Sequence, residues 1–177
     1  MNFWIGFVWE TVFDVGSLAA SLEENLVDLD NEYFYDGGSV NVEGARIKCW
    51  KAGGHGHQTF REVVQNSCNP GFVELGQRLG KEKLFEYINN FGFGIKTGID
   101  LNGESSGILF SLDKVGPVEL ATTSFGQGVS VTAIQQVAAV SAAVNGGTLY
   151  KPYIVKRLIE PETNEILKEN NPITIRK

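Results

Sequence analysis

The stretch from Gln65 to Phe72 constrains the fold more than any other part of the chain, because it is typical of a junction between two helices. Asn69 is a favourable N-cap residue, Pro70 suits the first helical position, and an apolar-periodic helix follows. The junction also gathers a hydroxyl, a thiol and a carboxamide in Ser67-Cys68-Asn69. Polar side chains at the start of a helix lie near backbone N–H groups that favour anions, so this junction is the first candidate site.

Hydrophobic periodicity predicts a chain that is mainly helical, with short strands between and after the helices. The expected helices cover residues 10–25, 59–66, 70–79, 81–90 and 132–144, short strands fall within 28–56, and a β-hairpin covers 148–168. Gly80 and Gly92 are expected to end the helices that precede them. The glycine-rich stretch 92–130 is expected to be mostly irregular, and a stretch of that length is expected to be functional or to lie over a cleft. The predicted fold class is therefore α+β.

Composition excludes several classes of function. The chain has 177 residues, enough for one domain or a large part of one, and a net charge of −6 argues against nucleic acid as a partner. No apolar run is long enough for a membrane span. The apolar start of the chain lacks a basic region and a cleavage site, so it is a poor signal peptide. We leave residues 1–10 unplaced, treat 11–177 as one partial domain, and expect no cofactor.

Four separated blocks of sequence resemble one family, in the order in which that family carries them. They are 67–76, 91–94, 125–132 and 145–152. They resemble the transpeptidase domain of class B penicillin-binding proteins, and most of all the sporulation-specific members. The resemblance implies a serine-type D,D-transpeptidase that cross-links peptidoglycan stem peptides for the cell wall or spore cortex and is acylated by β-lactams. It also implies a place on the extracytoplasmic face of the membrane, although this chain shows no anchor.

The family's active site combines Ser-x-x-Lys, Ser-x-Asn and Lys-Thr-Gly. The resemblance makes Ser67 a proton relay and Asn69 the residue that holds the substrate amide. The first element aligns with residues 11–14, where Thr11 takes the position of the nucleophilic serine and Asp14 that of the lysine. A hydroxyl is a weak nucleophile until a base takes its proton, so this substitution predicts an inactive chain.

The third element has a misleading counterpart in Lys96-Thr97-Gly98. The family carries a similar, non-catalytic segment here, and its catalytic Lys-Thr-Gly follows the block at 145–152 much later than Lys177. The chain is therefore expected to be the helical half of a β-lactamase-like domain with a C-terminal β-hairpin and most of the central sheet missing. Exposed apolar faces would favour self-association. The alternative is a non-enzymatic remnant that binds a peptide or a partner.

Three further side chains leave alternatives open. Cys49 and Cys68 form either a disulfide, which would lock the cleft, or two buried free thiols. A zinc site of these cysteines with His55 and His57 matches no usual ligand spacing, so no metal is expected. Trp50 either lines the cleft and stacks on a ligand, as the family's aromatic residue near this position does, or is a core or rim residue.

Overall fold

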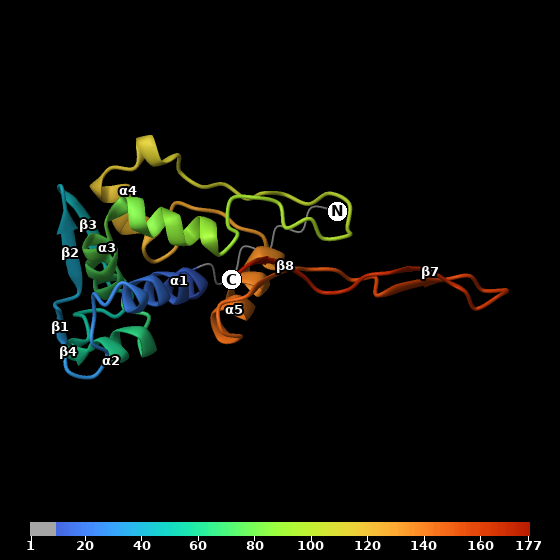
Figure 1. Ribbon diagram of the computed structural model, residues 1–177. Coiled ribbons are helices and arrows are strands. Elements are labelled where there is room, and N and C mark those ends of the chain that lie inside the picture. The colour runs from blue at the N-terminus through green and yellow to red at the C-terminus, as the bar shows by residue number, and fades with distance from the viewer. Residues whose placement is uncertain (1–9) are drawn as a thin grey trace.

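The computed structural model describes residues 10–177, with side chains from Val12 onward. Within this part of the chain, helices form the body and strands pair only two at a time (Figure 1). The unplaced N-terminal segment lies outside the described residues apart from its last residue. The elements in chain order are α1 (Glu10–Glu23), β1 (Tyr33–Asp36), β2 (Ser39–Val42), β3 (Ala45–Lys48), β4 (Gly56–Thr59), α2 (Phe60–Gln65), α3 (Asn69–Asn90), the 3₁₀ turn η1 (Leu112–Lys114), α4 (Pro117–Thr123), α5 (Ala133–Val144), β5 (Leu149–Lys151), β6 (Arg157–Ile159), β7 (Ile166–Glu169) and β8 (Ile173–Arg176).

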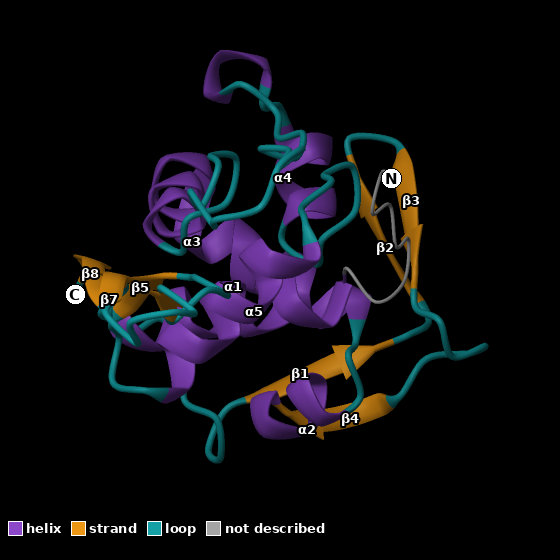
Figure 2. Ribbon diagram, turned by 90° about the vertical axis from the view of Figure 1, so that its right-hand side faces the viewer, coloured by secondary structure: helices purple, strands orange, loops and turns teal. Residues whose placement is uncertain are grey.

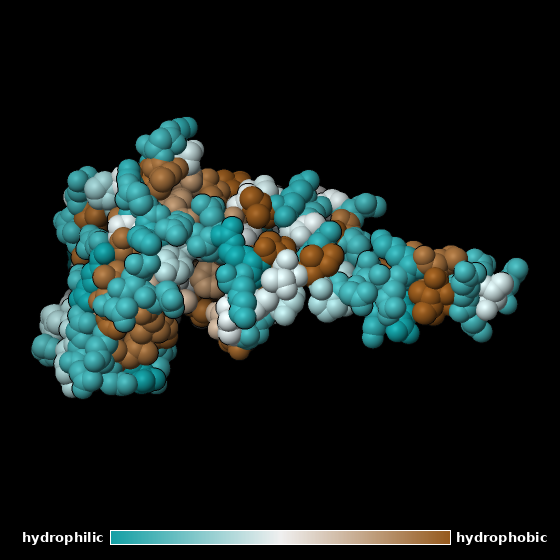
Figure 3. Space-filling model, viewed as in Figure 1, coloured by the Kyte–Doolittle hydropathy of each residue, from teal (hydrophilic) through white to brown (hydrophobic). Residues whose placement is uncertain are grey.

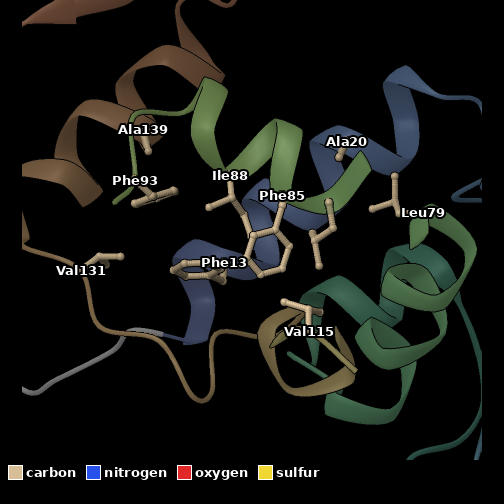
Figure 4. Packing of buried hydrophobic residues seen from close by; sticks show 10 residues of the cluster. Phe13, Ala20, Leu79, Phe85, Ile88, Phe93, Val115, Val131 and Ala139 are labelled. Atoms are coloured by element: carbon tan, nitrogen blue, oxygen red, sulfur yellow. The ribbon is translucent and has the colours of Figure 1, made fainter. Parts of the chain in front are cut away.

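One hydrophobic core lies where α1, the second half of α3 and α5 come together (Figures 2 and 4). Phe13 of α1 is 2% exposed, and its ring stacks on Phe93 with the ring centroids 5.0 Å apart. Figure 4 shows Phe85 and Ile88 of α3 pointing toward the same centre, with Ala139 of α5 at its edge. Burial of these large apolar side chains is the main force that holds α1 against α3.

A second core lies under the β1–β4 and β2–β3 strand pairs and around the start of α3. Phe60 and Val63 of α2 pack there against Phe72 of α3, and all three side chains are fully buried. The helices approach closely, because a Cβ added to Gly71 would lie 2.4 Å from a methyl carbon of Val63. This second core positions the α2–α3 junction.

Helix α3 is broken where the sequence predicts a stop. Gly80 has a φ of +74° and a ψ of 163°, so the continuous assignment Asn69–Asn90 is two helical segments joined at a kink. Only glycine adopts this backbone conformation without strain, which confirms the predicted end of the first segment. The expected N-cap was wrong by one residue: Cys68 is the N-cap and Asn69 is already helical.

Two antiparallel strand pairs cover the start of α3. β1 pairs with β4, so that Asp36 lies opposite Gly56, and β2 pairs with β3. The register brings the end of β1 next to the loop that precedes β4. The β1–β4 pairing thus places Asp36 beside His55, which lies 19 positions later in the chain.

The C-terminal strands form a ribbon that projects from the body (Figure 1). β6 and β7 make the predicted hairpin, but β5 pairs instead with β8, a strand that the sequence analysis did not assign. Hydrophobic side chains on the ribbon are exposed, and Figure 3 shows them as a patch near its end. They are Leu158, Ile159, Ile166 and Leu167.

The stretch predicted to be irregular contains two elements that the sequence analysis missed, η1 and α4. α4 begins at Pro117 and packs on α3. Its seven residues carry too few apolar repeats for periodicity to reveal it. The α+β fold class, with helices predominating and only short two-stranded sheets among residues 10–177, is confirmed. None of the described helices has both the length and the hydropathy that a membrane span requires.

Candidate functional site

The joint between α2 and α3 is built by a capping box and a left-handed turn. The Thr59 hydroxyl accepts from the backbone N–H of Glu62 at 3.3 Å, and the Thr59 N–H donates to the Glu62 carboxylate at 2.7 Å. α2 ends at Gln65, and Ser67 then has a φ of +44°, which is uncommon for a residue other than glycine. This turn allows α3 to begin at Asn69, so the polar residues of the joint stand at the start of that helix.

Ser67 contacts Asp14 directly. The Ser67 hydroxyl donates to Asp14 Oδ2 at 2.6 Å, which joins residues of α1 and of the joint that lie 53 positions apart in the chain. Asp14 is 4% exposed, whereas Ser67 is half-buried and remains accessible from one side. The structure therefore brings together the intact second element and the altered lysine position. Thr11 lies in the first turn of α1, but its side chain falls outside the described residues.

Asn69 and Trp50 are both held by backbone carbonyl groups near the joint. The Asn69 carboxamide donates to the carbonyl of Lys48 at 3.3 Å and is 8% exposed. The Trp50 indole N–H donates to the carbonyl of Asn66 at 2.7 Å, while 66% of the residue stays exposed. Trp50 is thus a rim residue that is fixed in place, not a core residue.

The Lys96-Thr97-Gly98 segment forms a closed loop of its own. The backbone N–H and the hydroxyl of Thr97 donate to Glu104 Oε1 at 2.6 and 2.5 Å, and the Gly98 N–H donates to Glu104 Oε2 at 3.0 Å. Residues 96–98 therefore lie in a loop and belong to none of the described helices or strands. A hollow of about 520 Å³ lies between α3 and residues 107–112, and neither Ser67 nor Asn69 lines it.

A second group of polar side chains lies on the other side of the joint. Asp36, Cys49, His55 and Cys68 each offer one potential ligand atom, and these four atoms all lie within 4.8 Å of one another. His55 Nδ1 is 3.0 Å from Asp36 Oδ2 and 3.4 Å from Cys49 Sγ. The Cys68 thiol donates to Asp36 Oδ2 at 3.4 Å. Both cysteines are free thiols, which is the second of the two alternatives left open by the sequence.

The environment of this group changes its acid–base behaviour. Burial alone would raise the pKa of Asp36, but hydrogen bonds from the Cys49 thiol, the Gly38 N–H and His55 outweigh it and hold the pKa at about 2. Burial raises the pKa of Cys68 to about 12, and it also raises that of Cys49. In the structure, a carboxylate therefore lies among neutral thiols.

Sequence reasoning anticipated this group only in part. It considered Cys49, His55 and Cys68 together but paired them with His57, whose ring lies 4.8 Å from the ring of Tyr35 and outside the group. It missed Asp36, which stands at the end of β1. Its spacing from the cysteines follows no ligand motif, and only the β1–β4 pairing brings it close.

Comparison with known proteins gives one consistent result. The family model of the penicillin-binding protein transpeptidase domain matches residues 12–176. Stage V sporulation protein D of Bacillus subtilis is 67% identical over 171 residues, which cover 94% of this chain and 26% of that protein. Penicillin-binding protein PbpB of Mycolicibacterium smegmatis is 32% identical over 94% of this chain and 25% of its own length. The chain thus spans about a quarter of the length of these relatives.

The fold agrees with solved structures as well. Penicillin-binding protein 3 of Mycobacterium tuberculosis, in its crystal structure complexed with aztreonam, matches with a TM-score of 0.84 and 30% sequence identity. The match covers 96% of this chain and 38% of that one.

Proposed function

This chain belongs to the family of penicillin-binding protein transpeptidase domains, and on that premise we propose that it is a partial transpeptidase domain of peptidoglycan cross-linking whose nucleophile helix is altered. The domain runs from about residue 11 onward. Its ligands are the stem peptide and β-lactams, in keeping with the aztreonam complex of the mycobacterial relative. Its place is the extracytoplasmic face of the membrane, and its similarity to stage V sporulation protein D favours a role in the spore cortex.

The contact between Ser67 and Asp14 is the observation that carries this proposal. In the family, the residue at position 14 is a lysine, which takes the proton of the nucleophile. Here the position holds a carboxylate that accepts the Ser67 proton at 2.6 Å. A negative charge at this place opposes the oxyanion that forms during acyl transfer, where donors and cations are needed.

The nucleophile position adds a second obstacle. Thr11 carries a methyl group on the same carbon as its hydroxyl, and this group hinders the approach of the hydroxyl to the substrate carbonyl. Asp14 supplies no positive charge to lower the barrier to acyl transfer. Loss of the nucleophile in a comparable acyl-transfer site costs about 10⁶ in rate, or roughly 8 kcal/mol of barrier. We therefore expect the natural chain to be catalytically inactive.

Intact mass spectrometry after incubation with ampicillin tests this expectation. We expect no covalent adduct on the natural chain. The variant Thr11→Ser/Asp14→Lys removes the methyl group beside the hydroxyl and supplies the base, and Thr11→Ser/Asp113→Lys is its charge-matched control, since Asp113 is exposed and lies in η1. An adduct on the first variant alone would locate the defect in the nucleophile helix. A stoichiometric adduct on the natural chain would contradict the proposal, and peptide mapping would then identify the residue that reacts.

A second function, non-enzymatic binding of a peptide or partner, is favoured by one observation. Trp50 presents an exposed aromatic face that is fixed by its hydrogen bond to the joint, as a stacking residue in a binding site would be. Exposed apolar side chains on the projecting ribbon offer a further surface, which could also drive self-association. Saturable binding of a stem peptide without acylation, lost in Trp50→Ala, would favour this function.

A further inference from the structure

Four segments that are distant in sequence contribute one side chain each to the group behind the joint. Asp36 comes from the end of β1, Cys49 from the residue after β3, His55 from the residue before β4, and Cys68 from the N-cap of α3. Their ligand atoms all lie within 4.8 Å of one another. The fold thus converges on a point where two sulfur atoms, one ring nitrogen and one carboxylate oxygen face each other.

This convergence is buried. The side chain of Asp36 is 0% exposed and that of His55 is 5% exposed, and both cysteines are buried. His55 Nδ1 faces the group, whereas its Nε2 is buried without a hydrogen-bond partner among the described residues. The His55 ring is therefore held through Nδ1, the nitrogen that faces Asp36. Removing a carboxylate and an imidazole from water is costly unless a compensating charge or full hydrogen bonding accompanies them.

Backbone N–H groups next to the four side chains donate to two of them, as the groups that surround metal ligands do. The Gly38 N–H donates to Asp36 Oδ1 at 2.8 Å, which orients the carboxylate so that its other oxygen faces the cysteines. The Lys51 N–H points to Cys49 Sγ at 3.4 Å, a contact that stabilises a thiolate. Such hydrogen bonds fix the orientation of metal ligands and tune their basicity.

We propose that Asp36, Cys49, His55 and Cys68 bind one divalent, thiophilic metal ion, and that this ion is Zn²⁺. Two thiolates, one imidazole and one carboxylate are a tetrahedral donor set typical of zinc, with bond lengths of about 2.0–2.3 Å. The present spacing of the atoms requires only small side-chain movements to reach that geometry. All four positions are filled by protein, so the site is closed and structural.

The ion would hold the active-site joint in place. Cys68 stands between Ser67 and Asn69, so a metal bond to its sulfur fixes the backbone that carries both residues. The same ion ties the ends of β1, β3 and β4 to the start of α3. This inference does not depend on whether the chain is catalytically active, because none of its ligands belongs to the nucleophile helix.

Metal binding to the purified, reduced and metal-free chain tests the proposal. We expect one Co²⁺ per chain, with the intense visible bands of tetrahedral cobalt and the sulfur-to-cobalt charge-transfer band in the near ultraviolet. One equivalent of Zn²⁺ should displace the cobalt. His55→Ala, Cys49→Ser and Cys68→Ser should each weaken cobalt binding by more than about 100-fold, since even second-shell changes cost 10–100-fold.

Two control variants make the test specific. His57→Ala removes an imidazole two positions away that packs at an angle against the Tyr35 ring, and Asp28→Asn removes an exposed carboxylate. Both should bind cobalt as the natural chain does, whereas Asp36→Asn should lose the tetrahedral spectrum. Should the ligand variants fail to fold, the natural chain provides a second readout. Zn²⁺ should protect both thiols from alkylation, and a chelator should restore their reactivity.

Three results would overturn the proposal. The first is substoichiometric cobalt binding by the reduced natural chain. The second is an equal loss of binding in His57→Ala and His55→Ala. The third is a Cys49–Cys68 disulfide that forms in air as readily with Zn²⁺ present as without it, because a thiolate bound to zinc is withheld from oxidation.

Discussion

Two polar groups meet at the α2–α3 joint, and they differ in how they are enclosed. Ser67 is half-buried and faces Asp14 on α1 through one short hydrogen bond. The next residue, Cys68, is fully buried and faces Asp36 on the opposite side. Adjacent residues thus have carboxylate partners from different elements, Asp14 of α1 and Asp36 of β1. The open side is therefore the one suited to chemistry, and the closed side is the one suited to holding the joint.

The sequence has altered these two sides differently. On the open side, our proposal puts Asp14 at the position of the family's basic residue. On the closed side, all four side chains converge as a ligand set would. The two sides rest on different contacts, so a substitution on one side can leave the other side intact.

The two groups share one hydrophobic support, and removing it should have the largest effect. Phe72 is fully buried in the core beneath the joint. Phe72→Ala should lower the free energy of unfolding by about 3–5 kcal/mol, because it removes a large buried side chain and leaves a cavity. Urea denaturation followed by circular dichroism measures this change. The alkylation rates of Cys49 and Cys68 should rise together.

The control for this change lies on the projecting ribbon. Leu167 is 61% exposed, so Leu167→Ala should alter stability by no more than about 0.5 kcal/mol. Equal losses in the two variants would mean that the ribbon is as important to stability as the core beneath the joint.

A double-mutant cycle should show whether the two groups are energetically separate. Ser67→Ala removes one hydrogen bond to a carboxylate and should cost about 1.5–3 kcal/mol. Asp36→Ala removes the shared acceptor of Gly38, His55 and Cys68 and should cost more. The partners differ, since Ser67 donates to Asp14. The coupling energy should therefore stay below about 0.5 kcal/mol when measured with a chelator present. A coupling above about 1 kcal/mol would show that the groups form one network.

The sequence predicted the parts of this site that depend on local patterns. Gly80 after an apolar-periodic stretch correctly indicated a helix stop, and Pro70 correctly indicated a helix start. The hairpin predicted within 148–168 is confirmed for its second part, where β6 pairs with β7. These features depend on residues that are close in the chain, so their patterns are visible without the fold.

The features that the sequence did not predict depend on contacts between distant residues. Asp36 reaches Cys68 across 32 positions through a strand pairing that has no local marker. β5 pairs with β8, although the hairpin between them offers a nearer partner. The Ser67–Asp14 hydrogen bond was not predicted either, although the resemblance had assigned both residues to one site.

The smallest effect is expected at Asp100, an exposed carboxylate that can be compared with the buried Asp36. Both accept hydrogen bonds from backbone N–H groups. The two oxygens of Asp100 accept from the Ile154 and Val155 N–H groups, each at 2.8 Å, at the base of the ribbon. The hydrogen bond from Ile154, and after it that from Val155, lower the pKa of Asp100 below its ordinary value of 3.8. At neutral pH, Asp100→Asn should accelerate hydrogen exchange of both amides modestly and leave the joint unchanged.

The pH dependence of this effect follows from the sign of the shift. A carboxylate whose pKa is lowered by folding stabilises the folded state fully above its ordinary pKa, and that contribution is lost as the pH falls through the lowered value. The difference in amide exchange between Asp100→Asn and the natural chain should therefore persist down to about pH 4 and vanish below the pKa of folded Asp100. A difference that vanished well above pH 4 would contradict the lowered pKa. It would also mean that the ribbon is anchored by other contacts, because an exposed acceptor would then contribute too little to order its base.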